Sequence, residues 1–433
     1  MRSAISAVVF LLSLWVSGPL YALTLQDAVK AGLKNSHTLK GASHETDIDK
    51  YRRDTAQAAL MPKVTSRYGY SRTDRSAGGD GRDSSSAGVA VSWNLFNGLA
   101  DLNTYRSAAA GYQARQFQET GQVEDYKLKV INAYIEVLSA RKKRAVATES
   151  EALLQSQLKT TRLSYKVGLF PKNEVLKVES RAVAAHRKVL EAQRRVRVAI
   201  FDLEKVTGLT LSGAEPLTDF PAETPGVPAL DQLTAMMDAN RSELKYLDTL
   251  LTSRGYDARA AKGSWWPSLD VSAGWTHYGD SAMPDGRAYG HNDDTVARAD
   301  LSWTLFDGTA RKSRLASARS EVSRVQETLA DTRLTLETAL KRVVEDYRLA
   351  VASYDAAHSE VASARENHRV TEAMVKARSA TPTDLLDANM MLTQAENSRA
   401  EARYAMYRAM AEMERAVETP LFFDGGKRFF DYD

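Results

Sequence analysis

The sequence predicts an α+β protein in which a small antiparallel sheet continues into very long helices, and three observations support this. Two stretches of roughly 70 residues are rich in Ala, Leu, Glu, Arg and Gln, the composition of long helices. Four shorter segments alternate apolar and polar residues, as strands do. A tryptophan motif occurs twice at a fixed offset. Each half of the chain is therefore expected to run helix, strand, loop, strand, long helix, turn, helix.

Residues 1–22 have the pattern of a signal peptide. Arg2 provides the positive start, Ala7 to Val16 the apolar run, and Gly18 to Ala22 the region before the expected cleavage site. The apolar run is about 10 residues long, whereas a membrane span needs roughly 20. No later apolar run approaches spanning length, so we expect the mature chain to be either soluble outside the inner membrane or inserted as a β-barrel.

Composition argues against several classes of function. The net charge of +3 arises from 58 basic and 55 acidic residues mixed along the chain, so no nucleic-acid partner is expected. The chain has no cysteine, which excludes disulfides, thiolate metal sites and a lipoprotein anchor. Its seven histidines form no metal-binding spacing, and no nucleophile motif is present. No catalytic residue, metal or cofactor is predicted, and the protein is not expected to be an enzyme.

The internal repeat defines the domain organisation. Residues Trp93 to Gly98 (WNLFNG) and Trp303 to Gly308 (WTLFDG) agree at four of six positions and lie 210 residues apart. Glu174 and Asp384 correspond at the same offset. A proline-rich connector, residues 208–228, separates the halves. We predict a signal peptide at 1–22, a first repeat at 23–215, a second repeat at 216–420 and a C-terminal tail at 421–433.

The predicted strands cover about residues 63–72 and 87–95 in the first repeat, and 268–278 and 295–305 in the second. A soluble sheet also alternates apolar and polar residues. Strand length, long polar loops at about 73–86 and 279–295, and aromatic residues near the strand ends instead favour strands that cross a bilayer. The aromatic residues expected at the membrane interface are Tyr70, Trp93, Trp275, Tyr278 and Trp303.

The predicted helices include one long helix per repeat, at 99–167 and 309–378, each about 105 Å in length. Shorter return helices are expected at 171–207 and 382–417. A free-standing antiparallel coiled coil would explain these helices, but it would leave the strands unexplained. Four strands are too few to close a barrel, whereas three copies of the chain would supply about twelve. The sequence thus predicts a homotrimer.

The duplicated Trp-x-Leu-Phe-x-Gly segments and this architecture resemble the TolC-type outer-membrane efflux protein family across the mature chain. The resemblance implies a trimeric channel-tunnel in the outer membrane of a Gram-negative bacterium. Each chain would give four transmembrane strands to a 12-stranded barrel in outer-membrane lipid, and long periplasmic coiled-coil helices to an α-barrel. The implied partners are a periplasmic adaptor and an inner-membrane pump of the ABC or RND type. Such a channel performs no chemistry.

The resemblance also locates the periplasmic tip. Val167-Gly168-Leu169 matches the family's Val-Gly-Leu turn, which meets the adaptor, and the second tip turn contains Ser379, Ala380 and Thr381. The second turn lacks the usual glycine. Ala380 and Val375 stand where some members carry a gating Arg and Tyr, and nearby Arg378 is a candidate substitute.

Asp384 and Asp387 match the family's Asp-x-x-Asp motif. Spaced one helical turn apart and repeated in three subunits, they would form acidic rings at the periplasmic aperture. The alternative is that they only begin a helix, where acidic residues are favoured. At the level of function, the alternative is a periplasmic scaffold or adhesin without a pore. The cargo, protein or small molecule, stays open, although the missing lipid-anchor cysteine favours protein secretion.

Overall fold

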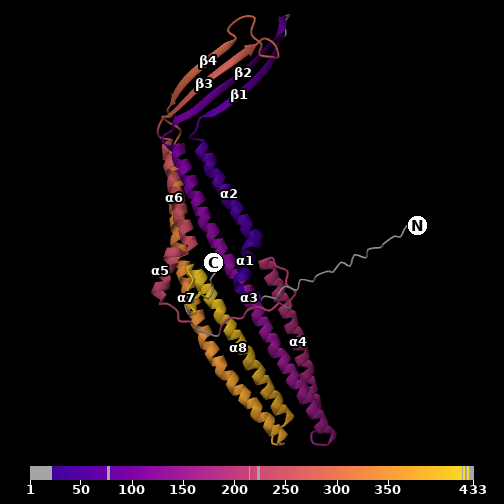
Figure 1. Ribbon diagram of the computed structural model, residues 1–433. Coiled ribbons are helices and arrows are strands. Elements are labelled where there is room, and N and C mark those ends of the chain that lie inside the picture. Colours follow the sequence, from indigo (N-terminus) through magenta and orange to yellow (C-terminus); the bar gives the residue numbers. More distant parts are fainter. Residues whose placement is uncertain are drawn as a thin grey trace, which may run out of the picture.

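The computed structural model describes residues 22–75, 79–213, 215–221, 225–421, 423–424 and 427–428. The molecule is elongated, with a sheet at one end and two helix-to-helix turns at the other (Figure 1). The first repeat contains α1 (Leu25–Asn35), α2 (His37–Ala58), β1 (Lys63–Arg75), β2 (Gly79–Phe96), α3 (Ala100–Lys166) and α4 (Lys172–Thr207). The second contains α5 (Leu230–Asn240), α6 (Ser242–Gly263), β3 (Ser268–Gly279), β4 (Asp293–Ser302), α7 (Ala310–Lys376) and α8 (Pro382–Val417). Two-residue strands β5 (Phe423–Asp424) and β6 (Lys427–Arg428) follow.

Two hairpins form the four-stranded sheet. Its order is β1-β2-β3-β4, with every neighbouring pair antiparallel. The register places Val64 opposite Val91 and, through the next pair, Ala273 opposite Ala297. Since side chains alternate between faces, one face carries these apolar residues and the other carries Ser92, Ser272 and their neighbours. Strands β1 and β4 are edge strands with no partner in the described part of the chain.

The first hairpin differs from its prediction. Residues 73–86 were expected to form a long loop, but β2 already begins at Gly79. The pairing continues through Tyr70 opposite Ser85 and Ser71 opposite Ser84. Main-chain hydrogen bonds hold this extension, and they form whichever side chains the residues carry. The polar composition of this segment therefore led to a predicted start of β2 that was too late.

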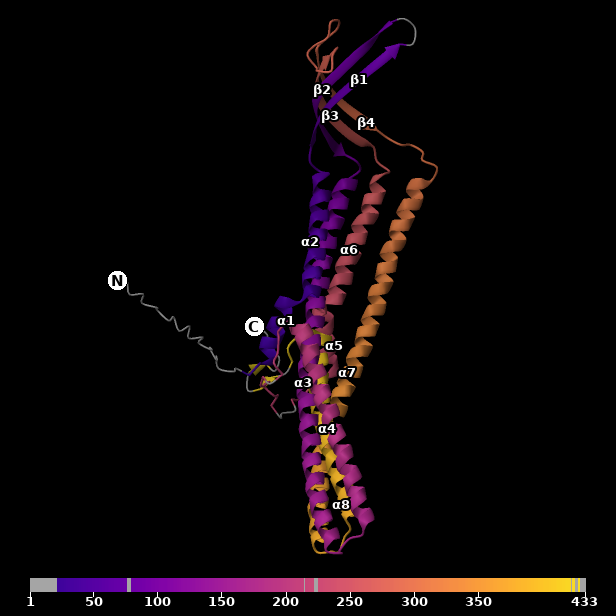
Figure 2. The same cartoon turned by 90° about the vertical axis from the view of Figure 1, so that its right-hand side faces the viewer.

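Each long helix is accompanied by two shorter helices placed end to end. Helices α2 and α4 lie along α3, α8 lies along α7, and α6 lies between α3 and α7 (Figures 1 and 2). Helices α3 and α7 each contain 67 residues, about 100 Å at 1.5 Å per residue. At one junction, the side-chain amide of Asn35 donates to the carbonyl oxygen of Thr207 (3.0 Å). At the other, the backbone N–H of Ser242 donates to the carboxylate of Glu418 (3.1 Å).

The repeat is present in the backbone as well as in the sequence. The backbone is left-handed at four residues beside the ends of helices α3 and α4, and these are Gly98, Leu99, Gly168 and Gly208. Each has a left-handed counterpart 210 positions later, and these are Gly308, Thr309, Arg378 and Glu418. Three of the four counterparts are not glycine, although the conformation favours glycine. The fold therefore requires a chain reversal or helix end at these places, whichever residue occupies them.

Buried tyrosines hold the connector between the repeats against the middle of the helices. The Tyr134 hydroxyl lies 2.8 Å from the carbonyl oxygens of both Leu23 and Thr218. The hydroxyl of Tyr347 donates to the carbonyl oxygen of Pro225 (2.6 Å), and that of Tyr407 donates to that of Pro221. These bonds satisfy carbonyl groups in a segment without regular structure.

Replacing Tyr134 by Phe should loosen this attachment. The substitution leaves the carbonyl groups of Leu23 and Thr218 without their donor, which should lower the free energy of unfolding by about 1–3 kcal/mol. The midpoint of thermal unfolding measures the change. Tyr165→Phe is the matched control, because Tyr165 is exposed and its hydroxyl makes no hydrogen bond within the described residues. Equal midpoints for the two variants would contradict the role given to Tyr134.

Candidate functional site at the helical tip

The candidate site is the end of the molecule farthest from the sheet, where the α3–α4 and α7–α8 turns lie near one another (Figure 1). Both turns have the hydrogen bonds of a Schellman motif. In the first, the backbone N–H of Leu169 donates to the carbonyl oxygen of Ser164, and that of Gly168 donates to Tyr165, both at 2.9 Å. This closes α3 with Gly168 in the left-handed region at φ 76°.

The second turn repeats this geometry without the glycine. The backbone N–H of Ser379 donates to Met374 (2.9 Å) and that of Arg378 donates to Val375 (3.1 Å). Arg378 has φ 63°, a conformation that costs a non-glycine residue roughly 1–2 kcal/mol. The turn therefore forms without glycine. The backbone of Arg378 is strained there, and its side chain adds a positive charge to the turn.

Asp384 closes a capping box at the start of α8. The backbone N–H of Thr381 donates to Oδ2 of Asp384 (2.8 Å), and the backbone N–H of Asp384 donates to the Thr381 hydroxyl (3.2 Å). The first of these bonds, together with one from the Thr381 hydroxyl, holds the pKa of the Asp384 carboxyl below its usual value. The carboxylate is stabilised in the folded state, and this contribution is lost only as the pH falls through the lowered pKa.

Asp387 lies one turn further along α8. It is exposed and makes no hydrogen bond or ion pair with the residues that the structure describes. Asp384 is exposed too, and its Oδ1 has no partner in the same part of the chain. The structure thus supports helix capping for Asp384, but capping does not use Asp387.

Three residues that sequence reasoning did not assign to the site join α4 to α8. The Thr383 hydroxyl donates to Oε2 of Glu174 (2.8 Å), and the Lys177 ammonium donates to Oε1 (2.8 Å). The Lys177 bond, followed by the Thr383 bond, lowers the pKa of the Glu174 carboxyl. Glu174 and Lys177 are the repeat counterparts of Asp384 and Asp387, so the 210-residue offset was the signal that could have found them.

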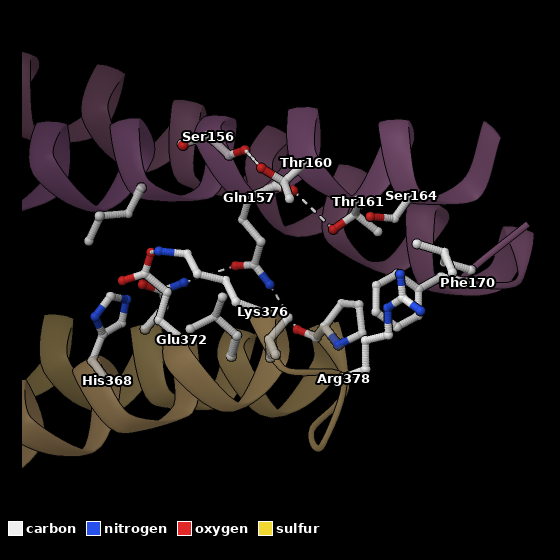
Figure 3. A pocket seen from close by; sticks show the side chains of 16 residues that line it. Ser156, Gln157, Thr160, Thr161, Ser164, Phe170, His368, Glu372, Lys376 and Arg378 are labelled. Carbon is white, nitrogen blue, oxygen red and sulfur yellow. Dashed lines mark hydrogen bonds and ion pairs between the residues drawn. The ribbon is translucent and has the colours of Figure 1, made fainter. Parts of the chain in front are cut away.

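The remaining tip residues differ in exposure and direction. Val167 is 70% exposed and Leu169 43% exposed, so the first turn presents apolar side chains to solvent. Arg378 is also exposed and extends toward Phe170 of the other turn (Figure 3). It forms no ion pair with the described residues, Asp384 and Asp387 included.

The predicted interface aromatics do not all share one face of the sheet. By register, Tyr70 and Trp275 lie on the apolar face with Trp93. The indole N–H of Trp93 donates to the Leu60 carbonyl oxygen (3.0 Å), and that of Trp303 donates to Trp265 (3.3 Å). Tyr278 lies on the polar face, with the Arg287 guanidinium 3.8 Å from its ring centre. Exposed Trp265, Trp266 and Phe306 stand at the sheet–helix junction and were missed.

Comparison with known proteins identifies the family. The profile of the outer membrane efflux protein family matches residues 28–209 and 234–417, which is most of both repeats. Protein CyaE of Bordetella pertussis is 26% identical over 343 residues, 77% of this chain and 71% of CyaE. Alkaline protease secretion protein AprF of Pseudomonas aeruginosa is 24% identical over 412 residues, 91% of this chain and 84% of AprF. Outer membrane protein TolC of Escherichia coli is 22% identical over 393 residues, 87% and 78% of the two chains.

Solved structures share the fold. The CmeC outer membrane channel of Campylobacter jejuni has a TM-score of 0.82 at 14% identity, covering 94% of this chain and 87% of CmeC. The outer membrane protein VceC of Vibrio cholerae has a TM-score of 0.80 at 14% identity, covering 91% and 96%. The predicted α+β channel-tunnel fold is therefore confirmed.

The chain belongs to the outer membrane efflux protein family. It is an outer-membrane channel protein that extends into the periplasm, as the resemblance predicted. Among the helices of the described residues, none combines the length and apolar character that crossing a bilayer requires.

The two tip turns predict opposite responses to substitution. A Cβ at Gly168 would meet no atom within 4 Å, so Gly168→Ala should cost only the left-handed conformation, roughly 1 kcal/mol. Arg378→Gly should stabilise its turn by a similar amount, about 0.5–1 kcal/mol. Amide hydrogen exchange at Leu169 and Ser379 reports the local opening. Faster exchange at Ser379 in Arg378→Gly would show that the side chain stabilises the turn by other means.

Proposed function

We propose that three copies of the chain form a continuous duct that carries cargo from an inner-membrane pump across the periplasm and the outer membrane. The observation that carries this proposal is the open four-stranded sheet. Edge strands β1 and β4 leave a row of main-chain N–H and C=O groups without partners in the described chain. In hydrocarbon such groups must be paired. Pairing β4 of one copy with β1 of the next satisfies them, and three copies close a barrel of twelve strands.

The helices support the same assembly. Helix α4 buries one face against α3 but exposes an apolar stripe at nearly heptad spacing, with side chains 40–66% exposed. The stripe consists of Leu176, Val183, Leu190, Val198 and Phe201. Helix α7 also exposes apolar side chains, which are Leu334, Leu349, Val370 and Met374. Two different apolar edges on one chain fit a head-to-tail contact that closes into a ring.

The tip provides the contacts with partners and the aperture. Exposed Val167 and Leu169, with Gly168 between them and Ser379, Ala380 and Thr381 in the second turn, form the surface offered to a periplasmic adaptor. The adaptor connects the duct to an ABC or RND pump. Asp384 and Asp387 from three copies would surround the aperture, where their charge attracts cations. The relative AprF, which is named for alkaline protease secretion, favours protein cargo.

The channel itself performs no chemistry in this proposal. The second candidate function, a periplasmic scaffold or adhesin without a pore, requires the apolar face of the sheet to be covered by something other than lipid. Membrane fractionation separates the two. A channel should need detergent for extraction and should migrate as a trimer, whereas a scaffold should be released by washing.

Val183→Asp combined with Leu190→Asp should dissociate the trimer. Each copy would place two carboxylates in an apolar contact, and burying one Val or Leu contributes about 1.5–3 kcal/mol. Light scattering of the protein in detergent measures the assembly mass. Lys188→Asp is the control, because Lys188 is exposed on α4 but lies outside the stripe. Persistent trimers in the double variant would place the interface elsewhere.

The double substitution Asp384→Asn and Asp387→Asn removes the charge of the proposed acidic rings. It should therefore raise the single-channel conductance for anions and weaken block by Mg²⁺ by about tenfold or more. Planar-bilayer recording of the reconstituted channel measures both. Thr381→Ala separates charge from capping, since it loosens the start of α8 but keeps both carboxylates. Equal loss of block in Thr381→Ala would attribute the effect to helix capping.

A further inference from the structure

Positive charge is concentrated part of the way down the periplasmic helices of the first repeat. Between residues 181 and 197, α4 carries six Arg or Lys residues and a single carboxylate. Helix α3 contains four consecutive basic residues at 141–144. Helices α3 and α4 lie side by side here (Figure 1), and Arg141 of α3 and Ile200 of α4 lie beside the same residue, Gly213. The two basic segments are therefore neighbours.

Most of these cations have no partner of opposite charge. Arg187 lies 3.7 Å from a carboxylate oxygen of Glu191, and Lys143 lies 3.6 Å from one of Glu401. Arg141 donates to backbone carbonyl oxygens instead. The remaining cations are exposed and form no ion pair with the described residues, and these are Lys142, Arg144, Arg181, Lys188, Arg194, Arg195 and Arg197.

Three of the unpaired cations form a row along α4. Arg181, Lys188 and Arg195 are seven residues apart, so their side chains lie on one side of the helix. The row is about 20 Å long, and it includes no residue of the apolar stripe that we assign to contact between copies. A small anion needs cations that converge on one point, whereas an extended row of cations matches an extended chain of anionic groups.

The second repeat lacks this unpaired charge. The basic run of α3 corresponds to residues 351–354, which are Val, Ala, Ser and Tyr. The segment of α8 that corresponds to the basic part of α4 has two arginines, and both are paired. Arg399 pairs with Glu396 (2.6 Å) and Arg403 with Asp219 (3.3 Å). Because equivalent helices of the same chain form without these cations, helix stability does not account for them.

The position of the basic segments limits the choice of partner. About 60 Å of helix separates Arg141 from the start of α3 beside the sheet, and about 40 Å separates it from the tip. Both distances are several times the Debye length of about 8–10 Å, so the charges of membrane head groups, or of a partner held only at the tip turns, are screened here. The periplasm also contains peptidoglycan, a linear glycan polymer whose peptide side chains carry free carboxylates.

We propose that a basic patch, defined as Lys142 and Arg144 of α3 with Arg181, Lys188 and Arg195 of α4, binds the carboxylates of peptidoglycan. Arg and Lys form charge-assisted hydrogen bonds with carboxylates, and the row on α4 is long enough to engage several of them along one strand of the polymer. Three copies of the chain place three such patches around the duct, and the cell wall then holds the channel in place. This inference goes beyond the export function, because binding to the wall requires no pump, adaptor or aperture.

Co-sedimentation of the full-length protein in detergent with purified peptidoglycan sacculi tests the proposal. The unaltered protein should bind saturably at low ionic strength and be released at high ionic strength, since salt screens exposed charges. The row variant, Arg181→Gln with Lys188→Gln and Arg195→Gln, should weaken the affinity about tenfold or more. The control variant, Lys30→Gln with Lys34→Gln and Lys40→Gln, removes the same charge from exposed positions on α1 and α2 and should keep the affinity unchanged.

Further measurements test the chemistry of the partner and exclude other roles for the row. Sacculi whose carboxyl groups have been amidated should no longer bind the unaltered protein. Light scattering in detergent and single-channel recording should give the same assembly mass and conductance for the row variant as for the unaltered protein, so failure of wall binding is distinct from failure of export.

Three results would overturn the proposal: no saturable binding by the unaltered protein, equal affinities of the row and control variants for sacculi, or undiminished binding to amidated sacculi. A smaller assembly mass in the row variant alone would also overturn it, because the row would then belong to the contact between copies.

Discussion

The unsatisfied edges of the sheet are the constraint on which the rest of the architecture depends. Four strands give one chain an apolar face but no closed ladder, and a bilayer supplies no water to complete it. In the proposed assembly, other copies of the chain supply the main-chain partners. The same copies would then meet along the helices, where α4 carries an exposed apolar stripe. Sheet closure and helix association are thus two parts of one requirement.

The order of the elements could be predicted because it depends on local, periodic signals. Helices α3 and α7 begin and end within one or two residues of their predicted bounds, since uninterrupted helical periodicity is a strong signal. The start of β2 could not be predicted, because hydrogen bonds with β1 rather than residue type extend it to Gly79. The family's Val-Gly-Leu turn predicted the first tip turn, and correspondence between the repeats predicted the second. The left-handed conformation of Arg378 could not be predicted, because arginine does not favour it.

The candidate site shows the same division. Asp384 and Asp387 could be named as candidates from their match to the family's Asp-x-x-Asp motif. Their difference in role depends on Thr381, whose capping bonds involve only Asp384. The contact between Thr383 and Glu174 (2.8 Å) joins residues 209 positions apart, and the Gln157–Asn389 pair joins residues 232 positions apart. No local pattern reports such contacts, because they arise only when the two repeats pack against each other.

Position 174 corresponds to position 384, and position 177 to position 387. These two pairs give the duplicated chain a property that a chain of one repeat would lack. A single repeat could build a similar ring from six copies, but all six turns would then carry identical charge. In the duplicated chain the first turn pairs Glu174 with Lys177 (2.8 Å), while the second leaves Asp387 unpaired among the described residues. A ring of three such chains has nearly six-fold backbone symmetry but only three-fold electrostatic symmetry. The presence of two unlike repeats in one chain therefore separates the shape of the tip from its charge.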